Sequence, residues 1–253
     1  VPGTDLTTPG PSGYSVLAVV NPTGAVAEAD TTNNQMTATF TSTTVPTFKT
    51  TIFPVVLASG TGDISAANKD AWAARLAKMY PVASVDVAVG STFTGSVSTL
   101  ESSGTGWSTL LSDLATKHQA DGANDRYYYG ALNVSYPSGV AGLGYVPSAP
   151  SASFAYRTAI GWDKTSGYKD GGLFPEVFAH EVGHNMGRPH SPCPLVDGPA
   201  NPDPAYPYAG GYIGVWGYDS TTNTLHSPTV DKDIMAYCTP NWVSDYVYKK
   251  ILD

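Results

Sequence analysis

One short stretch of the chain places histidine and carboxylate side chains at a regular spacing. Residues 180–190 read HEVGHNMGRPH. On a helix, side chains four residues apart lie on one face about one turn apart, so His180 and His184 can bind one metal ion together. Glu181, beside the first histidine, can then accept a proton from a water molecule at the metal without binding the metal itself. The stretch predicts a metal-binding helix with a general base next to it.

A third ligand becomes available because this helix must end before His190. Gly187 tolerates the left-handed backbone conformation that commonly ends helices, and Pro189 cannot continue one. The chain therefore turns sharply, and His190 can return to the same ion. Three protein ligands and one open position describe a catalytic zinc site, so the spacing predicts Zn²⁺ as the cofactor. The alternative, a surface helix with incidental histidines, is disfavoured by the fixed spacing of three His, one Glu and one Gly.

This pattern, HExxHxxGxxH, resembles the zinc signature of the metzincin metallopeptidases. Metzincins also carry a methionine turn downstream, and residues 233–238 (DIMAYC) resemble it. The resemblance implies that Met235 forms an apolar floor beneath the histidines, and that Tyr237 binds zinc in the resting enzyme and later hydrogen-bonds the oxyanion. Core packing is the alternative for Met235, and a hydroxyl that caps a backbone group is the alternative for Tyr237. Ser191 is typical of matrixin-like enzymes but the Met-x-Tyr spacing is not, which leaves the subfamily unassigned.

The two cysteines flank the predicted site. Cys193 lies three residues after the last histidine and Cys238 ends the methionine turn, so the resemblance places both near the zinc. A disulfide between them would join the two loops that build the site, and an extracellular setting favours it. The alternative is an additional thiolate ligand, which would close the open position and abolish catalysis.

Patterns of strand and helix alternate ahead of the histidine-rich helix, which begins near Pro175 because proline is favoured at the first helical position. Pro54, inside the first expected strand, suggests a sheet edge or a bulge. The alternation predicts an α/β (α+β) fold with helices packed on a mixed sheet. The expected strands cover residues 48–57, 85–89, 126–134, 140–146 and 154–162, and the other expected helices lie around 72–79, 107–118 and 243–252.

The resemblance also implies a two-lobed domain over residues 47–253. A twisted mixed sheet with helices would lie above the active-site cleft, and an irregular lower lobe would end in a helix. In metzincins an extended substrate lies along an edge strand above the cleft, which makes residues 143–146 our candidate for β-augmentation. Leu143, Gly144 and Tyr145 are the candidate substrate-binding residues. An ordinary glycine-containing strand is the alternative.

Residues 1–46 read as a β-strand segment, with strands expected over 14–20, 25–28 and 35–40. The stretch from Tyr14 to Asn34 resembles the last strands of an adhesion-type β-sandwich module. Either a partial sandwich lies here, or these strands join the main domain. Because the chain begins in what reads as mid-domain sequence, we expect that an upstream part was removed by processing or cloning.

Composition restricts the partners and the location. The chain has 253 residues and a formal net charge of -8, which disfavours nucleic acid and anionic membranes as partners. No apolar run approaches the ~20 residues of a membrane helix. Few charged residues together with abundant Gly and Pro are typical of a secreted protein, which we expect to be a monomer. Loops 30–34 and 197–203 could bind calcium but lack the spacing of a known loop, and His118 and His226 are expected to be structural.

The sequence therefore predicts a secreted zinc-dependent endopeptidase that acts on protein or glycoprotein substrates. Zinc would polarise the peptide carbonyl and acidify water, while Glu181 would carry a proton from that water to the leaving amine. One alternative is a narrow-specificity peptidase directed at glycoproteins or mucins. Another is an adhesion or recognition module that binds metal without turnover, but such a module would not need Glu181.

Overall fold

The computed structural model divides into two compact units, Val1–Val45 and Pro46–Asp253. The residues that the structure describes are 13–148, 153–165, 173–194, 198–199 and 201–253. Among them, no helix combines the length and the apolar character that crossing a bilayer requires.

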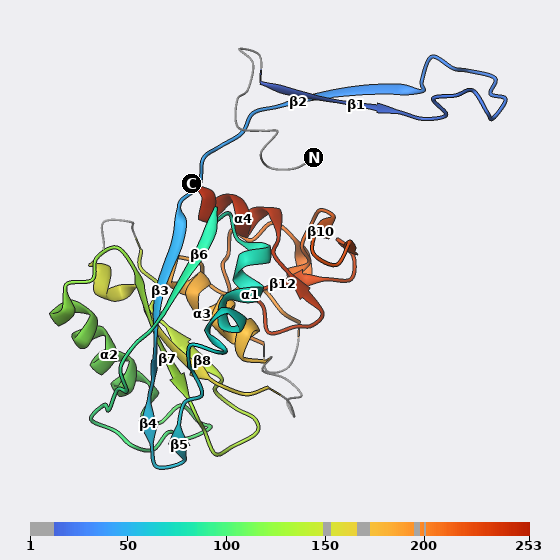
Figure 1. The fold of residues 1–253 in the computed structure, drawn as a ribbon. Helices are drawn as coiled ribbons and strands as arrows, with labels where there is room; N and C mark the ends of the chain where they lie inside the picture. Colours follow the sequence, from blue (N-terminus) through green and yellow to red (C-terminus); the bar gives the residue numbers. More distant parts are fainter. Residues whose placement is uncertain (1–12, 149–152, 166–172, 195–197, 200) are drawn as a thin grey trace. The chain divides into compact units, whose positions relative to one another are not determined.

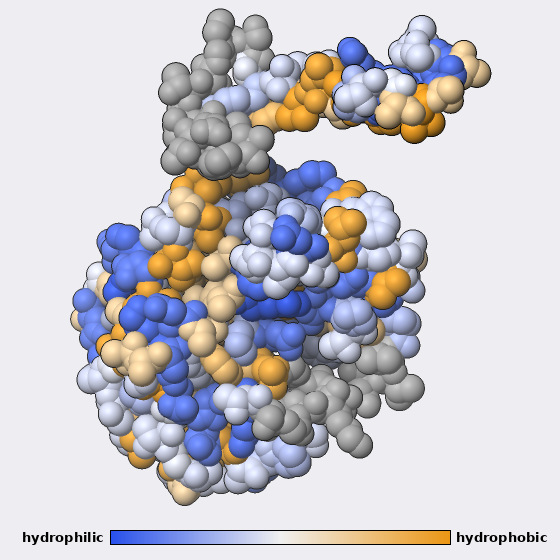
Figure 2. Space-filling view, turned by 45° about the vertical axis from the view of Figure 1, so that its right-hand side comes forward, coloured by the Kyte–Doolittle hydropathy of each residue, from blue (hydrophilic) through white to orange (hydrophobic). Residues whose placement is uncertain are grey.

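The first unit contains one β-hairpin, in which β1 (Tyr14–Val19) pairs antiparallel with β2 (Gln35–Phe40). The strand expected over 25–28 is absent, so that prediction is wrong. The side chain of Asn21 explains the difference, because it donates to the carbonyl of Val26 (2.7 Å) and accepts from its amide (3.1 Å). These bonds fold the connection into a loop, and β1 pairs directly with β2. Figure 2 shows hydrophobic residues on the surface of this hairpin.

A five-stranded mixed sheet forms the centre of the second unit. Its order is β6-β3-β7-β9-β8, with the first four strands parallel and β8 antiparallel at one edge. The strands are β3 (Thr47–Pro54), β6 (Ser84–Val89), β7 (Tyr127–Leu132), β8 (Gly142–Gly144) and β9 (Thr158–Trp162). The predicted mixed α/β fold is confirmed.

Of the two alternatives that Pro54 suggested, a sheet edge or a bulge, the edge is wrong. β3 lies inside the sheet, and Pro54 is its last residue, two positions beyond the end of its pairing with β6 at Ile52. Pro54 lies beyond the paired residues of β6, and its carbonyl accepts instead from the amide of Phe93 (2.9 Å). Regular pairing stops directly after it, and the chain continues into the small hairpin of β4 (Val56–Leu57) and β5 (Gly60–Thr61).

The strand expected over 154–162 is also shorter than predicted. Its first residues form the 3-10 turn η2 (Phe154–Tyr156), and β9 follows. The hydroxyl of Ser153 accepts a hydrogen bond from the amide of Ala155 (3.4 Å), which caps this turn locally. A side chain that satisfies the backbone in this way competes with strand formation.

Helices cover both faces of the sheet (Figure 1). They are α1 (Lys69–Met79), α2 (Trp107–Asp121) and α3 (Phe174–Asn185). Successive residues of β7 show the division, because side chains alternate between the two faces of a strand. Tyr128 packs in the apolar cluster that contains Leu114 of α2, whereas Tyr129 packs in the cluster that contains Phe178 of α3. The sheet is therefore the middle of three layers, and α3 lies on the face opposite α2.

The described residues between Ser191 and the final helix form only short elements. The short elements are η3 (Ala209–Gly211), β10 (Gly217–Asp219), β11 (Thr224–His226), β12 (Lys232–Asp233) and β13 (Asn241–Trp242), followed by α4 (Asp245–Leu252). The hydroxyl of Ser244 caps α4 by accepting from the amide of Val247 (3.0 Å). Val247 is buried in the same cluster as Phe178, so this irregular region is attached to the main core.

Candidate metal centre

Helix α3 carries the predicted ligands on a firmly packed frame. Pro175 lies in its first turn, and the carboxylate of Glu176 accepts from the amide of Leu173 (3.2 Å), which satisfies one free N–H at the helix start. Val177 and Phe178 are buried against the sheet. The helix therefore holds the residues of its other face in fixed positions.

The helix ends as the sequence requires for a third ligand. Gly187 has φ 76°, the left-handed conformation, and its amide donates to the carbonyl of His184 (2.8 Å). The amide of Arg188 donates back to the carbonyl of Gly183 (3.0 Å). The chain reverses here and brings His190 to the two helical histidines. The ligand atoms of the three histidines all lie within 4.8 Å of one another.

Backbone carbonyls orient the imidazoles. Nδ1 of His180 lies 2.8 Å from the carbonyl oxygen of Ile234, and Nδ1 of His184 lies 2.7 Å from that of Arg188. A carbonyl can only accept, so each Nδ1 carries the proton and each Nε2 keeps a lone pair. Such outer contacts fix the tautomer of metal-binding histidines.

The arrangement fits a tetrahedral metal ion. Nε2 of His184 lies 3.0 Å from Nε2 of His190. Two nitrogens on one tetrahedral zinc, each bonded at 2.0–2.1 Å, would be separated by about 3.3 Å. Burial lowers the pKa of His180 to about 4 and that of His190 to about 3, and it lowers the pKa of His184 as well. All three rings are therefore neutral at pH 7 and able to bind a cation.

Glu181 is a buried carboxyl beside this cluster. It is 6% exposed, and burial raises its pKa to about 8. A cation held by the neighbouring histidines would favour its charged form. Strand β8 packs directly against it, because a Cβ placed on Gly142 would lie 2.5 Å from Oε1 of Glu181.

Tyr237 lies next to the histidine cluster and is partly exposed. Its ring centre is 4.8 Å from that of His190 and 5.9 Å from that of His180, and the residue is 44% exposed. Burial, with a smaller effect of Glu181, raises its pKa to about 12. The phenol is therefore protonated at neutral pH and can donate a hydrogen bond.

Met235 lies beneath α3 and is fully buried. A Cβ on Gly183 would meet its sulfur and would lie 2.6 Å from the hydroxyl of Tyr80. That hydroxyl donates to the carbonyl of Ala179 (2.7 Å). The methionine turn is therefore in direct contact with the underside of the ligand helix.

Asp233, which sequence reasoning missed, joins three segments of the site. Its Oδ1 accepts from the hydroxyl of Ser191 (2.9 Å) and from the amide of Met235 (2.8 Å), and its Oδ2 accepts from the amide of Ser244 (2.8 Å). Asp233 is fully buried, and burial raises its pKa. This one carboxyl connects the residue after the third histidine to the methionine turn and to the start of α4.

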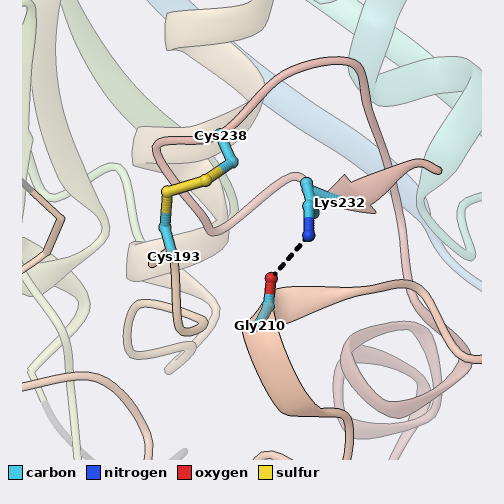
Figure 3. The surroundings of a disulfide bond; sticks show 4 residues. All are labelled: Cys193, Gly210, Lys232 and Cys238. Atoms are coloured by element: carbon cyan, nitrogen blue, oxygen red, sulfur yellow. Dashed lines mark hydrogen bonds between the residues drawn. A yellow bond between two sulfur atoms is a disulfide. The ribbon is translucent and has the colours of Figure 1, made fainter. Parts of the chain in front are cut away.

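The predicted disulfide is confirmed. Cys193 and Cys238 are bonded, with their Cα atoms 5.8 Å apart (Figure 3). Both sulfurs are used in this bond, so the thiolate-ligand alternative is excluded. Lys232 donates to the carbonyl of Gly210 (2.9 Å) close to this disulfide, which ties η3 to the same region.

The remaining histidines lie outside the cluster. His118 is buried on α2, with Nδ1 3.0 Å from the hydroxyl of Thr158 and Nε2 3.0 Å from the carbonyl of Ala123. His226 is stacked on Trp242 (4.0 Å between ring centres). Both have the structural surroundings that were expected.

Neither of the candidate calcium loops gains support. The carboxylate of Asp30 accepts from the amide of Thr32 (2.8 Å), and that of Asp203 accepts from the amide of Ala205 (2.9 Å). Each of these hydrogen bonds stabilises a local turn, and neither indicates a calcium site. Asp197 lies outside the described residues.

Two of the candidate substrate-binding residues, Leu143 and Gly144, lie in β8, and Tyr145 directly follows it. Strand β8 is an edge strand next to Glu181. Tyr145 N–H donates to the carbonyl of Thr158 (3.4 Å), so it faces β9. Backbone groups alternate in direction along an antiparallel strand, so Leu143 also faces β9, whereas Gly144 faces outward. Gly142, which the sequence did not single out, faces outward with Gly144.

Two family models match the part of the chain that contains this site. A model described as metallo-peptidase family M12B, reprolysin-like, matches residues 84–191, and a model described as peptidase M66 matches residues 164–248. No curated protein matches the sequence. Among solved structures, metalloproteinase-II from Bacteroides fragilis aligns at 15% identity with a TM-score of 0.43. The alignment covers 81% of this chain and 52% of that one, so the chain spans about half the length of that protein.

Proposed function

We propose that this chain, whose family matches and histidine cluster indicate a metzincin-type metallopeptidase, is an extracellular zinc-dependent endopeptidase that cleaves extended protein segments. The observation that carries the proposal is the position of Glu181. This buried carboxyl lies between three converging, neutral histidines and the free edge of a sheet. A proton acceptor, a cation site and a surface for a peptide main chain thus meet at one point.

The histidines have the donor set and the spacing for Zn²⁺, which would supply Lewis acidity at an open coordination position. Glu181 accepts a proton from the attacking water and delivers it to the leaving amine. Tyr237 donates a hydrogen bond to the oxyanion that develops on the substrate, which its raised pKa permits. Met235 and Asp233 keep the ligand helix and the turn below it in place.

The edge of β8 supports the choice of an extended substrate. Tyr145 N–H donates to the carbonyl of Thr158 (3.4 Å), and the carbonyl of Ala141 accepts from β9 (2.9 Å). By alternation, Gly142 and Gly144 direct their N–H and C=O groups away from β9. A peptide that pairs with both glycines passes in front of Glu181 and continues in both directions. Such binding favours cleavage inside a chain over removal of terminal residues.

The Cys193–Cys238 disulfide supports an extracellular location, because disulfides persist in oxidising compartments. We propose that the enzyme acts there as a monomer on protein substrates. The residues that form the site all come from the unit Pro46–Asp253, so the proposed chemistry needs no second chain.

The experiment compares wild type with Glu181→Gln on a panel of folded proteins, glycoproteins and internally quenched peptides. Zinc content is measured for both, and a chelator is added and then reversed with Zn²⁺. We expect wild type to cleave, the chelator to stop cleavage, and Glu181→Gln to keep its zinc but lose roughly 10²–10⁴-fold in rate. Glu101→Gln, a change of an exposed carboxylate, is the matched control.

Two results would contradict the proposal. One is a zinc-loaded Glu181→Gln protein that cleaves as fast as wild type. The other is a folded, zinc-loaded wild type that cleaves no member of the panel, which would indicate a metal-bound recognition module.

A further inference from the structure

We propose that Asn185 is a positioning residue, which fixes the edge strand β8 so that its glycines can pair with the main chain of a substrate. The inference rests on the proposed peptidase function. Asn185 is the last residue of α3, four positions after Glu181. Residues four apart lie on the same face of a helix, so the general base and this amide both face β8.

The side chain of Asn185 joins β8 to β9 at the point where their pairing ends. Its Nδ2 donates to the carbonyl of Tyr145 (3.0 Å) and to the carbonyl of Thr158 (3.0 Å). Tyr145 directly follows β8, and Thr158 is the first residue of β9. One amide group from the ligand helix thereby holds two neighbouring strands.

Gly144 brings the edge strand into direct contact with this helix. A Cβ on Gly144 would lie 2.7 Å from the carbonyl oxygen of Glu181 and 3.3 Å from Nδ2 of Asn185. No side chain fits between β8 and α3 at this point. The distance between the outward-facing backbone of Gly144 and the general base is therefore set by the hydrogen bonds of Asn185.

The surroundings of Asn185 indicate why an amide is used. The residue is 3% exposed, and its Oδ1 has no hydrogen-bond partner among the described residues. An unpaired buried oxygen destabilises a protein, so packing alone would favour an apolar side chain here. An apolar residue could not donate the two hydrogen bonds that Nδ2 makes to the carbonyls of Tyr145 and Thr158.

Strand β8 needs such an anchor because it is short and weakly held. It has three residues, two of them glycines, and it pairs on one side only. Glycine loses more backbone entropy on ordering than other residues, and edge segments with few contacts open most easily. Without Asn185, we expect β8 to remain folded on average but to exchange among several positions.

The test compares wild type with Asn185→Leu, which removes both donors and keeps a similar side-chain volume. Asn185→Ala is the second variant, for the case that leucine does not fit. Tyr128→Phe is the control, because it removes the bond from Tyr128 to Asp121 (2.7 Å) on the other face of the sheet. Zinc content and thermal unfolding establish that each protein is folded and loaded.

Two readouts report the role of Asn185 without requiring turnover. Calorimetry gives the affinities of acetohydroxamate, which reaches only the metal, and of a peptide hydroxamate long enough to span β8. We expect Asn185→Leu to weaken the peptide hydroxamate about tenfold or more and to change acetohydroxamate less than about twofold. Hydrogen exchange at the Tyr145 amide should become about tenfold faster. Tyr128→Phe should change neither.

An unchanged affinity ratio in a folded variant, or unchanged exchange at Tyr145, would overturn the inference. Failure of the wild type to cleave any peptide would instead contradict the proposed function. In that case the two readouts still decide whether Asn185 holds the edge strand, since neither depends on catalysis.

Discussion

Burial keeps His118 and the three clustered histidines neutral. The neutral ring has a different role in the two places. In the cluster, neutrality leaves Nε2 lone pairs free for a cation. At His118, both ring nitrogens already have partners, the hydroxyl of Thr158 and the carbonyl of Ala123. The carbonyl accepts, so Nε2 carries the proton and the hydroxyl donates to Nδ1. A second proton, on Nδ1, would place a positive charge in these buried surroundings, and burial accordingly lowers the pKa of this ring.

This difference predicts a pH dependence of stability. Burial lowers the pKa of His118 below its ordinary value of 6.5, so the unfolded chain binds a proton that the folded protein does not. The contribution of His118 is therefore fully present above pH 6.5 and is lost as the pH falls from there toward the folded pKa, with a slope of at most about 1.4 kcal/mol per pH unit. In His118→Gln, the free energy of unfolding should fall less steeply over this range. Urea titrations of both proteins, zinc-loaded, between pH 5 and pH 8 measure it.

Equal slopes in the two proteins would show that His118 does not contribute. Comparing both in the same metal state removes the effect of the other histidines, which titrate alike in each. The variant is expected to be somewhat less stable at pH 8, where its loss of ring stacking on Tyr128 (4.0 Å) is the main difference.

Asp233 carries a prediction about metal affinity. It binds the hydroxyl of Ser191, which follows the third ligand, and the amide of Met235, which lies below the ligand helix. Changes to such outer partners typically cost 10–100-fold in metal affinity. Asp233→Asn should therefore weaken zinc binding by roughly tenfold, measured by competition with a chromophoric chelator.

Asp219→Asn is the matched control for this change. Asp219 is also a buried carboxylate, which binds Lys78 (3.0 Å) and Thr221 (2.8 Å) away from the histidines. It should lower stability while zinc affinity stays the same. Equal losses of affinity in the two variants would mean that Asp233 acts only through general stability.

At the scale of elements, the sequence predicted correctly those helices and strands that local patterns of residues determine. Three helices were predicted correctly, those around residues 72–79 and 107–118 and the histidine helix. Apolar periodicity and helix-ending residues are local signals, so they can be read from the sequence. The strand over 25–28 failed because the side chain of Asn21 satisfied its backbone instead. The sheet edge suggested by Pro54 was wrong. A sheet interior accepts proline at this position because the pairing with β6 has already ended, and no local pattern encodes where that pairing ends.

The same division holds for the site. Three ligands and the base lie within eleven residues of sequence, so their spacing was readable in advance. Asp233 acts on Ser191 across 42 positions, and Asn185 acts on Thr158 across 27. No sequence motif marks Asp233 or Asn185, because their partners are distant in sequence and become neighbours only in the folded chain.

The disulfide acts at the scale of elements, because it joins the loop after the third ligand to the methionine turn. It closes 45 positions of sequence, for which the loop-entropy relation gives about 4 kcal/mol of stabilisation. Cys193→Ala with Cys238→Ala should lower the free energy of unfolding by up to that amount. Denaturant titration of the zinc-loaded proteins measures it. A double variant as stable as wild type would show that Asp233 and the packing of Met235 hold these loops without the bond.

At the scale of the whole molecule, the two units differ in how they are stabilised. The unit Pro46–Asp253 has apolar clusters on both faces of its sheet, and their first buried member is Phe48. Among the described residues of the first unit, 13–45, none belongs to such a cluster. In its hairpin, the directly paired residues Tyr14 and Phe40, Val16 and Ala38, and Ala18 and Met36 share one face, and that face is apolar throughout. Two-stranded hairpins are marginally stable alone, whereas the second unit has its own core, so we expect the second unit to fold independently.

We therefore predict that residues 46–253 fold and function without the first unit. Removing residues 1–45 leaves β3 intact, since that strand begins at Thr47. The shortened protein should keep the unfolding midpoint, the zinc content and the kcat/KM on quenched peptides of the longer chain. Removing residues 1–54 is the control, because it deletes a strand that pairs on both sides in the middle of the sheet, and this protein should not fold. A lowered midpoint or peptidase rate after the first deletion would contradict this independence, and substitution of Val16 and Met36 would then test whether the apolar face of the hairpin is responsible.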